Sequence, residues 1–226
     1  MSLIHDNKIV SATEGTDTLF WVDPWSKDGQ VFATRIRPIS SALRLHAEHA
    51  IVLIAQARNA NPNLREQDAL DAMDFGARRI DFLGLKFQLT DEMAAGYAQA
   101  VATIPATLAF RPGSGAQRPK PSVPALLSDI NGVNGRLEDL TYGYSQLRDM
   151  FQQQWLRTYR PANLTPVLER FDFTTQLWIS RIDRVRSAQR QWTESKSLPA
   201  ATDLGIPAPA AEAPTPIQLA PAGPPR

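Results

Sequence analysis

Two histidines stand three residues apart in a segment whose apolar spacing predicts a helix. His46 and His49 occur in the sequence His-Ala-Glu-His, and imidazole is both a common metal ligand and a proton carrier near neutral pH. The metalloprotease motif HExxH differs, because its histidines lie four residues apart and its glutamate directly follows the first of them. The chain has three histidines and no cysteine, so a good third ligand is lacking. We expect helix packing or surface hydrogen bonds for this pair, and no metal site.

Acidic residues recur along the next predicted helix, at positions 68, 71, 74 and 81. Two carboxylates can serve as general acid and base when their surroundings push their pKa values apart, and the sequence gives no sign of such surroundings. Asp74 and Arg78 are four residues apart, the spacing of an ion pair on a helix surface. We expect a solvated or interhelical ion-pair face. Asp74, Arg78 and Asp81 remain, with His46 and His49, candidates for a polar site.

The sequence carries no motif for other kinds of catalysis. No nucleophile elbow supports Ser-His-Asp chemistry. The sequence Gly-Ser-Gly at 113–115 lies in a proline-rich connector, whereas a phosphate-binding loop would stand between a strand and a helix. We therefore expect no catalytic residue and no cofactor.

Two tryptophans and an aspartate lie close together in the sequence Phe-Trp-Val-Asp-Pro-Trp at 20–25. Trp21 and Trp25 offer apolar rings and Asp23 offers a polar group, a combination on which sugar rings can stack. The same residues can equally anchor the N-terminal segment on the rest of the chain or contact another domain. From the local sequence we favour the anchor and keep sugar stacking and domain contact as alternatives.

Charge and hydropathy exclude two classes of partner. The chain has 24 Lys+Arg against 23 Asp+Glu, a formal net charge of +1, which argues against a nucleic-acid partner. Its start lacks the apolar stretch of a secretion signal, and no later stretch approaches the ~18 consecutive apolar residues that span a bilayer. We expect no membrane partner and a cytoplasmic location for the chain as written. In a longer exported protein, a signal peptide would precede Met1.

Prolines divide the chain into three parts. We expect an extended N-terminal segment at 1–33, with its only candidate strand at 17–22. A helical domain follows at 34–196, interrupted by a proline-rich connector at 105–124. The Pro/Ala-rich sequence at 197–226 has too few large apolar residues to offset its ordering entropy, which predicts a disordered tail.

Apolar residues repeat every three or four positions in four stretches of the central part. The first helix is expected from about Pro38, and the second from Asn63 to about Thr103, with a capping box of Asn63 and Glu66. A third helix follows a loop at 131–135 and stops before Pro161. The fourth begins where Thr165 caps Pro166. The second is apolar on two faces, which is typical of a central helix. The fold class predicted is all-α, an antiparallel bundle of about four long helices.

Four segments of this bundle resemble the C-terminal helical region of bacterial glycoside hydrolases of the family 20 (β-N-acetylhexosaminidase) type. They are residues 43–50, 68–88, 129–140 and 155–161, and the resemblance extends over roughly residues 17–197. In that family the chemistry belongs to a (β/α)₈ barrel with an adjacent Asp-Glu pair in the sequence His-x-Gly-Gly-Asp-Glu. The acetamido group of the substrate acts as the nucleophile there.

This chain departs from the family where catalysis is concerned. Its only Asp-Glu dipeptide, Asp91-Glu92, lies within a predicted helix without the histidine and glycines of the motif, so the catalytic role is not carried over. A (β/α)₈ barrel needs about 200 residues or more, which the chain cannot provide beside its bundle.

Three hypotheses follow from these observations. The resemblance implies a non-catalytic support domain, or fragment of an enzyme, that packs on a (β/α)₈ barrel or another protein through an exposed apolar face. A stand-alone helical interaction module is the alternative, and it predicts a well-covered monomer or a symmetric oligomer. The third is an enzyme that uses the helix containing Asp68 to Asp81 together with His46 or His49.

Overall fold

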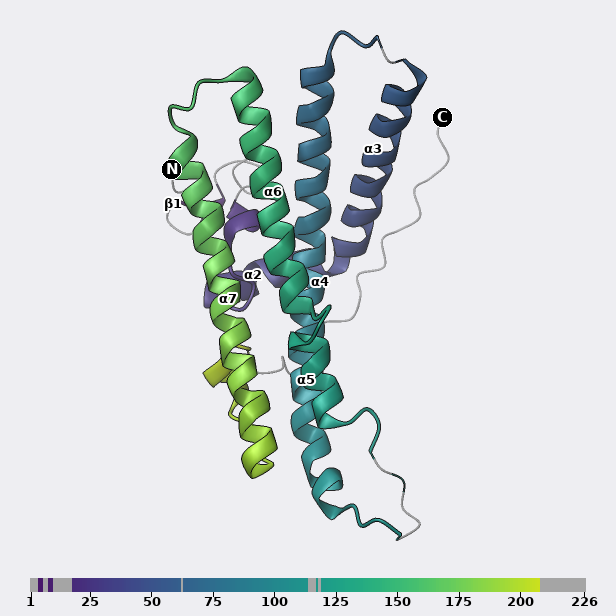
Figure 1. Ribbon diagram of the computed structural model, residues 1–226, viewed down its shortest axis with the longest axis vertical. Coiled ribbons are helices and arrows are strands. Elements are labelled where there is room, and N and C mark those ends of the chain that lie inside the picture. The colour runs from purple at the N-terminus through teal and green to yellow at the C-terminus, as the bar shows by residue number, and fades with distance from the viewer. Residues whose placement is uncertain are drawn as a thin grey trace.

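The computed structural model describes residues 4–5, 8–9, 18–61, 63–113, 117 and 119–207, and it confirms an all-α antiparallel bundle (Figure 1). Its four long helices are α3 (Ser40–Ala60), α4 (Gln67–Ala109), α6 (Arg136–Thr158) and α7 (Leu164–Ser195). The shorter helical elements are α2 (Lys27–Ile36), α5 (Val123–Asn131) and the 3₁₀ turns η1 (Arg37–Ile39) and η2 (Ala201–Leu204). Two short strands, β1 (Ile4–His5) and β2 (Lys8–Ile9), pair antiparallel.

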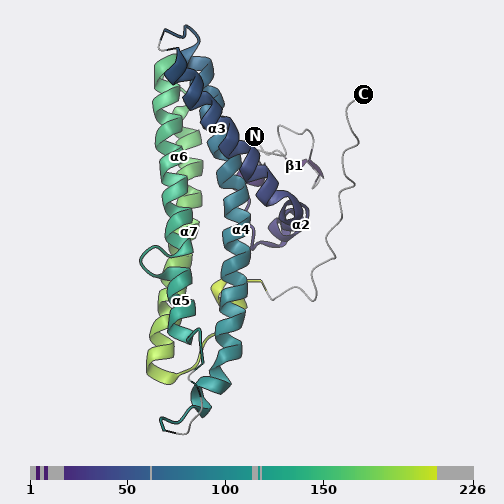
Figure 2. The same ribbon diagram turned by 90° about the vertical axis from the view of Figure 1, so that its right-hand side faces the viewer.

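The 43-residue helix α4 is the spine of the molecule. At 1.5 Å per residue it is about 65 Å long. Helix α3 packs beside its N-terminal half, and α5 and α6 return along it one after the other (Figures 1 and 2). Helix α7 lies against α6 and α5 and runs antiparallel to both. No helix in the described part of the chain is long and apolar enough to cross a membrane.

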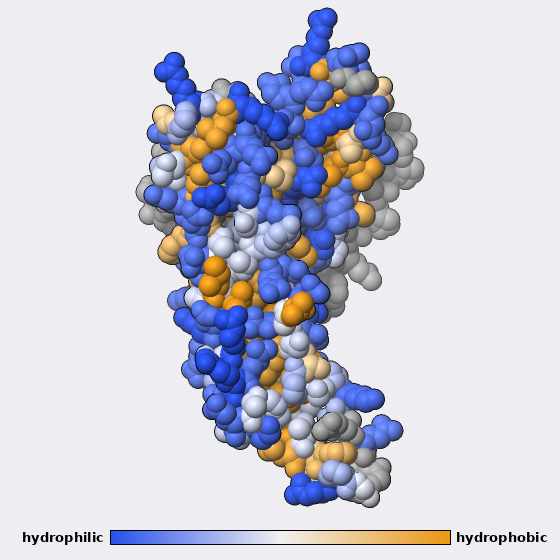
Figure 3. Space-filling model, viewed as in Figure 1, coloured by the Kyte–Doolittle hydropathy of each residue, from blue (hydrophilic) through white to orange (hydrophobic). Residues whose placement is uncertain are grey.

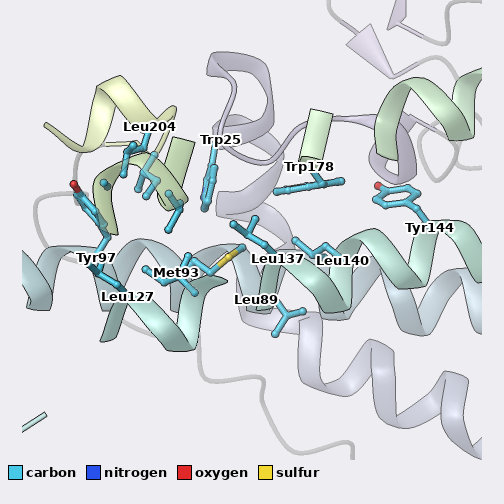
Figure 4. Packing of buried hydrophobic residues seen from close by; sticks show 14 of the residues in the cluster. Trp25, Leu89, Met93, Tyr97, Leu127, Leu137, Leu140, Tyr144, Trp178 and Leu204 are labelled. Atoms are coloured by element: carbon cyan, nitrogen blue, oxygen red, sulfur yellow. The ribbon is translucent and has the colours of Figure 1, made fainter. Parts of the chain in front are cut away.

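The main core lies between α4, α5, α6 and α7 because each contributes an apolar stripe. Figure 4 shows side chains of these helices meeting Trp25 of the N-terminal segment and Leu204 of η2. The fully buried members include Met93 and Tyr97 of α4, Tyr144 of α6 and Trp178 of α7. Such side chains repeat at intervals of three or four residues, which is the helical periodicity seen in the sequence.

A smaller core holds α2 against the opposite face of α4. Phe32, Ala33 and Ile36 of α2 pack on Leu83 and Phe87 of α4. The expectation that the second helix is central, with neighbours on two faces, is thereby confirmed.

The N-terminal segment differs from the expected extended conformation. Residues 18–21 form a helical turn, in which the amide of Val22 donates to the carbonyl of Thr18 at 2.9 Å, so the strand at 17–22 is wrong over its described residues. Residue 17 lies outside the described residues. Within the segment 1–33, α2 begins at Lys27, where the Ser26 hydroxyl accepts a hydrogen bond from the Gly29 amide at 3.0 Å.

The connector is shorter than predicted at both ends. Helix α4 continues through Pro105 to Ala109, and α5 begins at Val123 with Pro124 in its first turn, where proline is tolerated. The connection therefore spans residues 110–122 rather than 105–124. The loop expected at 131–135 is confirmed for residues 132–135, because α5 ends at Asn131 and α6 begins at Arg136.

Two predicted helix starts are also corrected. Glu66 stands at the N-cap of α4 without a side-chain capping bond, so the capping box with Asn63 is wrong. Helix α7 begins at Leu164, one residue before the expected cap at Thr165, and its N-cap Asn163 has a left-handed backbone with φ of 66°.

The first part of the predicted tail is ordered on the bundle. Leu204 and Ile206 are buried, and the Tyr97 hydroxyl donates to the carbonyl of Pro199 at 2.8 Å. The boundary at 197 is therefore wrong for residues 197–207. Residues 208–226 of that prediction lie outside the described residues.

Candidate functional site

A groove runs over α4 between α3 and α6, and we call it the α3–α6 groove. Its volume is about 300 Å³. It is lined by Ile51 of α3, by Arg78, Asp81, Phe82 and Leu85 of α4, and by Asp139, Tyr142, Gly143, Gln146, Leu147 and Met150 of α6. Because α3 and α6 both pack on α4, the groove is bounded by one helix on each side.

The floor of the groove is apolar and closely packed. The ring of Phe82 lies against Gly143, where an added Cβ would come within 2.1 Å of a ring carbon. The same ring meets Tyr144 edge to face, with the centroids 4.9 Å apart. The absence of a side chain at Gly143 thus allows α6 to approach α4 closely.

The polar residues predicted on α4 form ion pairs beside this floor. Arg78 donates to Asp74 at 3.1 Å, and Arg44 of α3 donates to Asp81 at 2.9 Å and to Gln88 at 2.9 Å. The structure therefore brings Arg78 and Asp81 into the groove and places Asp74 next to them. A carboxylate held by an arginine is typical of a structural ion pair.

The two predicted histidines lie elsewhere. His46 and His49 are exposed on α3, and neither lines the groove that contains Asp81. Within the described part of the chain, no group of three or more His, Cys, Asp or Glu side chains could hold a metal ion. The structure does not bring the histidines and the aspartates of α4 into one site.

Large apolar side chains project from α3 and α6 near the groove. Leu45 and Val52 of α3 are 65% and 50% exposed and stand seven residues apart, on one face of the helix. Tyr142, which lines the groove from α6, is 64% exposed. Figure 3 shows apolar surface over the region of α3 in the upper right of the view. We call Leu45 and Val52 the outer face of α3.

The predicted aromatic site is part of the interior rather than of the groove. Trp25 is only 7% exposed, packs on Trp178 with the ring centroids 6.0 Å apart, and donates from Nε1 to the carbonyl of Thr90 at 3.2 Å. Asp23 accepts hydrogen bonds from Arg181 and from the backbone amide of Trp25. These contacts hold the N-terminal segment on the bundle.

Trp21, the third member of that set, is half-buried between two phenylalanine rings. Its centroid lies 4.7 Å from that of Phe20 and 4.8 Å from that of Phe171, both edge to face. The guanidinium of Arg170 lies 5.1 Å from the centroid of Trp21, which is a cation–π distance. Phe171 and Arg170 of α7 thus hold the indole against the bundle.

Two buried cations complete the interior site and were not among the predicted residues. Lys86 is fully buried, and its Nζ donates to the carbonyls of Leu19 at 2.6 Å, Phe20 at 2.9 Å and Val22 at 2.9 Å. It therefore caps the C-terminal end of the turn at 18–21 with positive charge. Burial lowers the pKa of Lys86 to about 7, against the attraction of Asp23, which raises it.

Arg181 is the second buried cation. Its guanidinium lies 4.5 Å from the ring centroid of Trp25 and 4.6 Å from that of Trp178. Burial lowers the pKa of Arg181, and the hydrogen bond and charge of Asp23 oppose that shift. The sequence holds a signal for both cations, because Lys86 and Arg181 occupy positions of apolar stripes.

Comparison of the chain with protein-family models, with curated proteins and with solved structures found no match.

Proposed function

We propose that this chain is a non-catalytic helical support domain that docks on another folded domain through the outer face of α3 and the α3–α6 groove. The resemblance to the C-terminal helical region of family 20-type glycoside hydrolases implies that this other domain is a (β/α)₈ barrel. The exposed apolar surface of α3 is the observation that carries the proposal.

The exposed apolar side chains of α3 are more typical of a protein interface than of a helix surface that stays in water. Burying a leucine or valine stabilises by roughly 1.5–3 kcal/mol, and Leu45 and Val52 leave at least half of their surface in water. Helix α3 packs along α4, and among the described residues Leu45 and Val52 lie exposed on it. Exposed apolar patches rimmed by polar groups mark interaction sites.

The rim supports the same proposal. Arg78, Asp139 and Gln146 surround the apolar floor, which is the arrangement of an apolar centre and a polar edge found in protein interfaces. The ion pairs of Arg78 with Asp74 and of Arg44 with Asp81 are already formed in the free chain. Docking would therefore cost little side-chain entropy at these residues.

A stand-alone interaction module is the second candidate, and one observation favours it. The main core closes without a partner, because Trp178, Tyr144 and Tyr97 of three different helices are fully buried in the isolated chain. Such a chain can fold alone and bind a partner reversibly.

A binding experiment tests the docking surface. The full chain is mixed with the catalytic barrel of a bacterial family 20-type enzyme that lacks its own helical region, with the barrel's hydrolytic activity as proof of its folding. We expect a complex by size-exclusion chromatography and at least a tenfold weaker Kd for the double variant Leu45→Ser, Val52→Ser. Phe173→Ser is the matched control, because Phe173 is 77% exposed on α7. An unchanged Kd for the double variant contradicts the proposed surface.

Activity of the isolated chain tests the non-catalytic part of the proposal. We expect no hydrolysis of a chromogenic N-acetyl-β-glucosaminide by the folded chain. Turnover that disappears with Asp74→Asn, Asp81→Asn or His46→Gln would overturn it. If the chain forms no complex with an active barrel, the proposal that a (β/α)₈ barrel is its partner is overturned and the stand-alone module is favoured.

A further inference from the structure

A second hollow, distinct from the α3–α6 groove, lies where the beginning of α4 meets the end of α6. Its volume is about 370 Å³. It is lined by Asp68, Ala69 and Ala72 of α4, by Phe151, Gln154 and Trp155 of α6, and by Tyr159, which follows α6. We call it the aromatic pocket. We propose that the aromatic pocket binds the proline-rich segment 208–226 of this same chain.

Three aromatic rings form a ladder along one wall of the pocket. Phe151 and Trp155 have centroids 5.7 Å apart, and Trp155 and Tyr159 have centroids 5.0 Å apart. Trp155 donates from Nε1 to the carbonyl of Arg160 at 2.8 Å, which fixes the orientation of the indole. The outermost ring, Tyr159, is 61% exposed. A fixed row of partly exposed rings offers flat apolar faces to a ligand.

The opposite wall is small and acidic. Ala69 and Ala72 leave the rings accessible, and Asp68 is exposed and has no ion-pair partner in the described part of the chain. The nearby Asp71 differs, since Arg58 and Arg157 both bind it. The lining contains no lysine or arginine. The pocket therefore favours an apolar ligand that carries a positive charge.

Polyproline II segments fit this chemistry. They have no internal hydrogen bonds, repeat every three residues, and dock on aromatic-lined grooves at low entropic cost. The sequence at 221–226 is Pro-Ala-Gly-Pro-Pro-Arg, in which Pro221 and Pro224 are one such repeat apart. Arg226 is the only cation in the segment 208–226, and Asp68 is the unpaired carboxylate of the pocket. Residues 221–226 thus match the pocket in shape and in charge, and Glu212, the acidic residue of the segment, lies outside this stretch.

The segment is also long enough to reach the pocket. The described chain ends at Pro207. The segment before it contacts α4 at Tyr97, whose hydroxyl binds the carbonyl of Pro199, and Gly205 lies near Arg184 of α7. From Asp68 to Tyr97 is about 44 Å along the helix. Residues 207 to 224 span about 53 Å in polyproline II conformation. The proline-rich segment can therefore occupy the pocket of its own molecule.

A peptide of residues 208–226 with an amidated C-terminus and a fluorescent label tests the inference. Its binding is measured by anisotropy against the full chain and against a full-length variant with Pro221→Ala, Pro224→Ala and Arg226→Ala. A tethered segment has an effective concentration in the millimolar range, so we expect the peptide to bind the variant at least tenfold more tightly than the unaltered chain. This inference does not rest on the proposed support function.

Matched substitutions in that variant locate the binding site. Tyr159→Ala and Asp68→Asn change exposed side chains, and we expect each to weaken peptide binding at least fivefold with an unchanged thermal midpoint. Phe173→Ala, on α7, should leave it unchanged. No binding to the variant up to 1 mM peptide, or binding that Tyr159→Ala does not weaken, overturns the inference. Equal affinity for the variant and the unaltered chain overturns the intramolecular arrangement.

Discussion

Lys86 connects the N-terminal segment to the spine of the bundle. Its ammonium donates to three carbonyls at the end of the turn at 18–21, and Asp23 and Arg181 form an ion pair close by. A buried cation is costly unless hydrogen bonds and opposite charge compensate for lost hydration. Here backbone carbonyls supply most of that compensation, which explains why a lysine is found at an apolar stripe position.

Replacing Lys86 with methionine should destabilise the fold. Methionine matches the length of the side chain, but it leaves the carbonyls of Leu19 and Val22 without the Lys86 donor. The Phe20 carbonyl keeps its hydrogen bond from the Tyr144 hydroxyl. Buried polar groups without partners cost about 1–3 kcal/mol, so we expect a loss of about 2 kcal/mol in urea unfolding at pH 8. Lys27→Met is the control, because Lys27 is exposed in the first turn of α2. Equal stability of the two variants would contradict the capping role.

The lowered pKa of Lys86 predicts a pH dependence of stability. Its pKa is about 7 in the folded chain and returns toward the ordinary 10.5 on unfolding. Unfolding therefore takes up a proton between these values, and the free energy of unfolding rises as the pH rises through this window. From pH 7 to pH 9 the gain is on the order of 2 kcal/mol. Urea titrations at several pH values should show this rise in the unaltered chain and not in Lys86→Met, and parallel profiles would contradict it.

Among the elements, the four long helices could be predicted and the shorter ones could not. The stripes of α4 and α7 repeat over many turns, so periodicity alone identifies them. Helices α2 and α5 are 10 and 9 residues long, too short for a periodic signal, and prolines flank or enter both. Proline in a helix interior removes a hydrogen bond and predicts a helix end at Pro105, but α4 continues past it to Ala109.

The candidate site could be predicted only in part, because its remaining residues depend on which helices pair. Arg78 and Asp81 stand out as charges on a helix face. Tyr142 and Gly143 line the groove because α6 packs beside α4, which one sequence does not reveal. Lys86 likewise binds carbonyls 64 to 67 residues earlier in the chain. The sequence shows a lysine within an apolar stripe, but it does not show which groups that lysine binds.

Helix pairing also predicts opposite effects for two glycine substitutions. Gly143→Ala brings a Cβ within 2.1 Å of the Phe82 ring, so we expect a loss of about 1–3 kcal/mol from overpacking. Gly76→Ala meets no atom within 4 Å inside α4, and we expect a gain of up to about 1 kcal/mol from helix propensity. Chemical denaturation of both variants measures the difference. A stabilised Gly143→Ala would show that α4 and α6 do not approach this closely in solution.

At the scale of the whole molecule, α2 and α3 lie outside the main core in the described part of the chain. Helices α4, α5, α6 and α7 share the main core, while α3 contributes no residue to the buried members of that core. It packs on α4 through Ala47 and half-buried neighbours. The region proposed to dock on a partner is therefore a helix with few buried apolar side chains.

This unequal packing predicts unequal local stability. Segments with few buried contacts open at lower free energy than the core, so the amide hydrogens of α3 should exchange with solvent faster than those of α4 around Met93 and Tyr97. Hydrogen–deuterium exchange with mass spectrometry measures both regions in one sample. A bound partner that covers the outer face of α3 should slow exchange there by at least tenfold and leave the Met93 region unchanged. Equal protection of α3 and the core in the free chain would contradict this prediction, because it would mean that α3 unfolds only with the whole bundle.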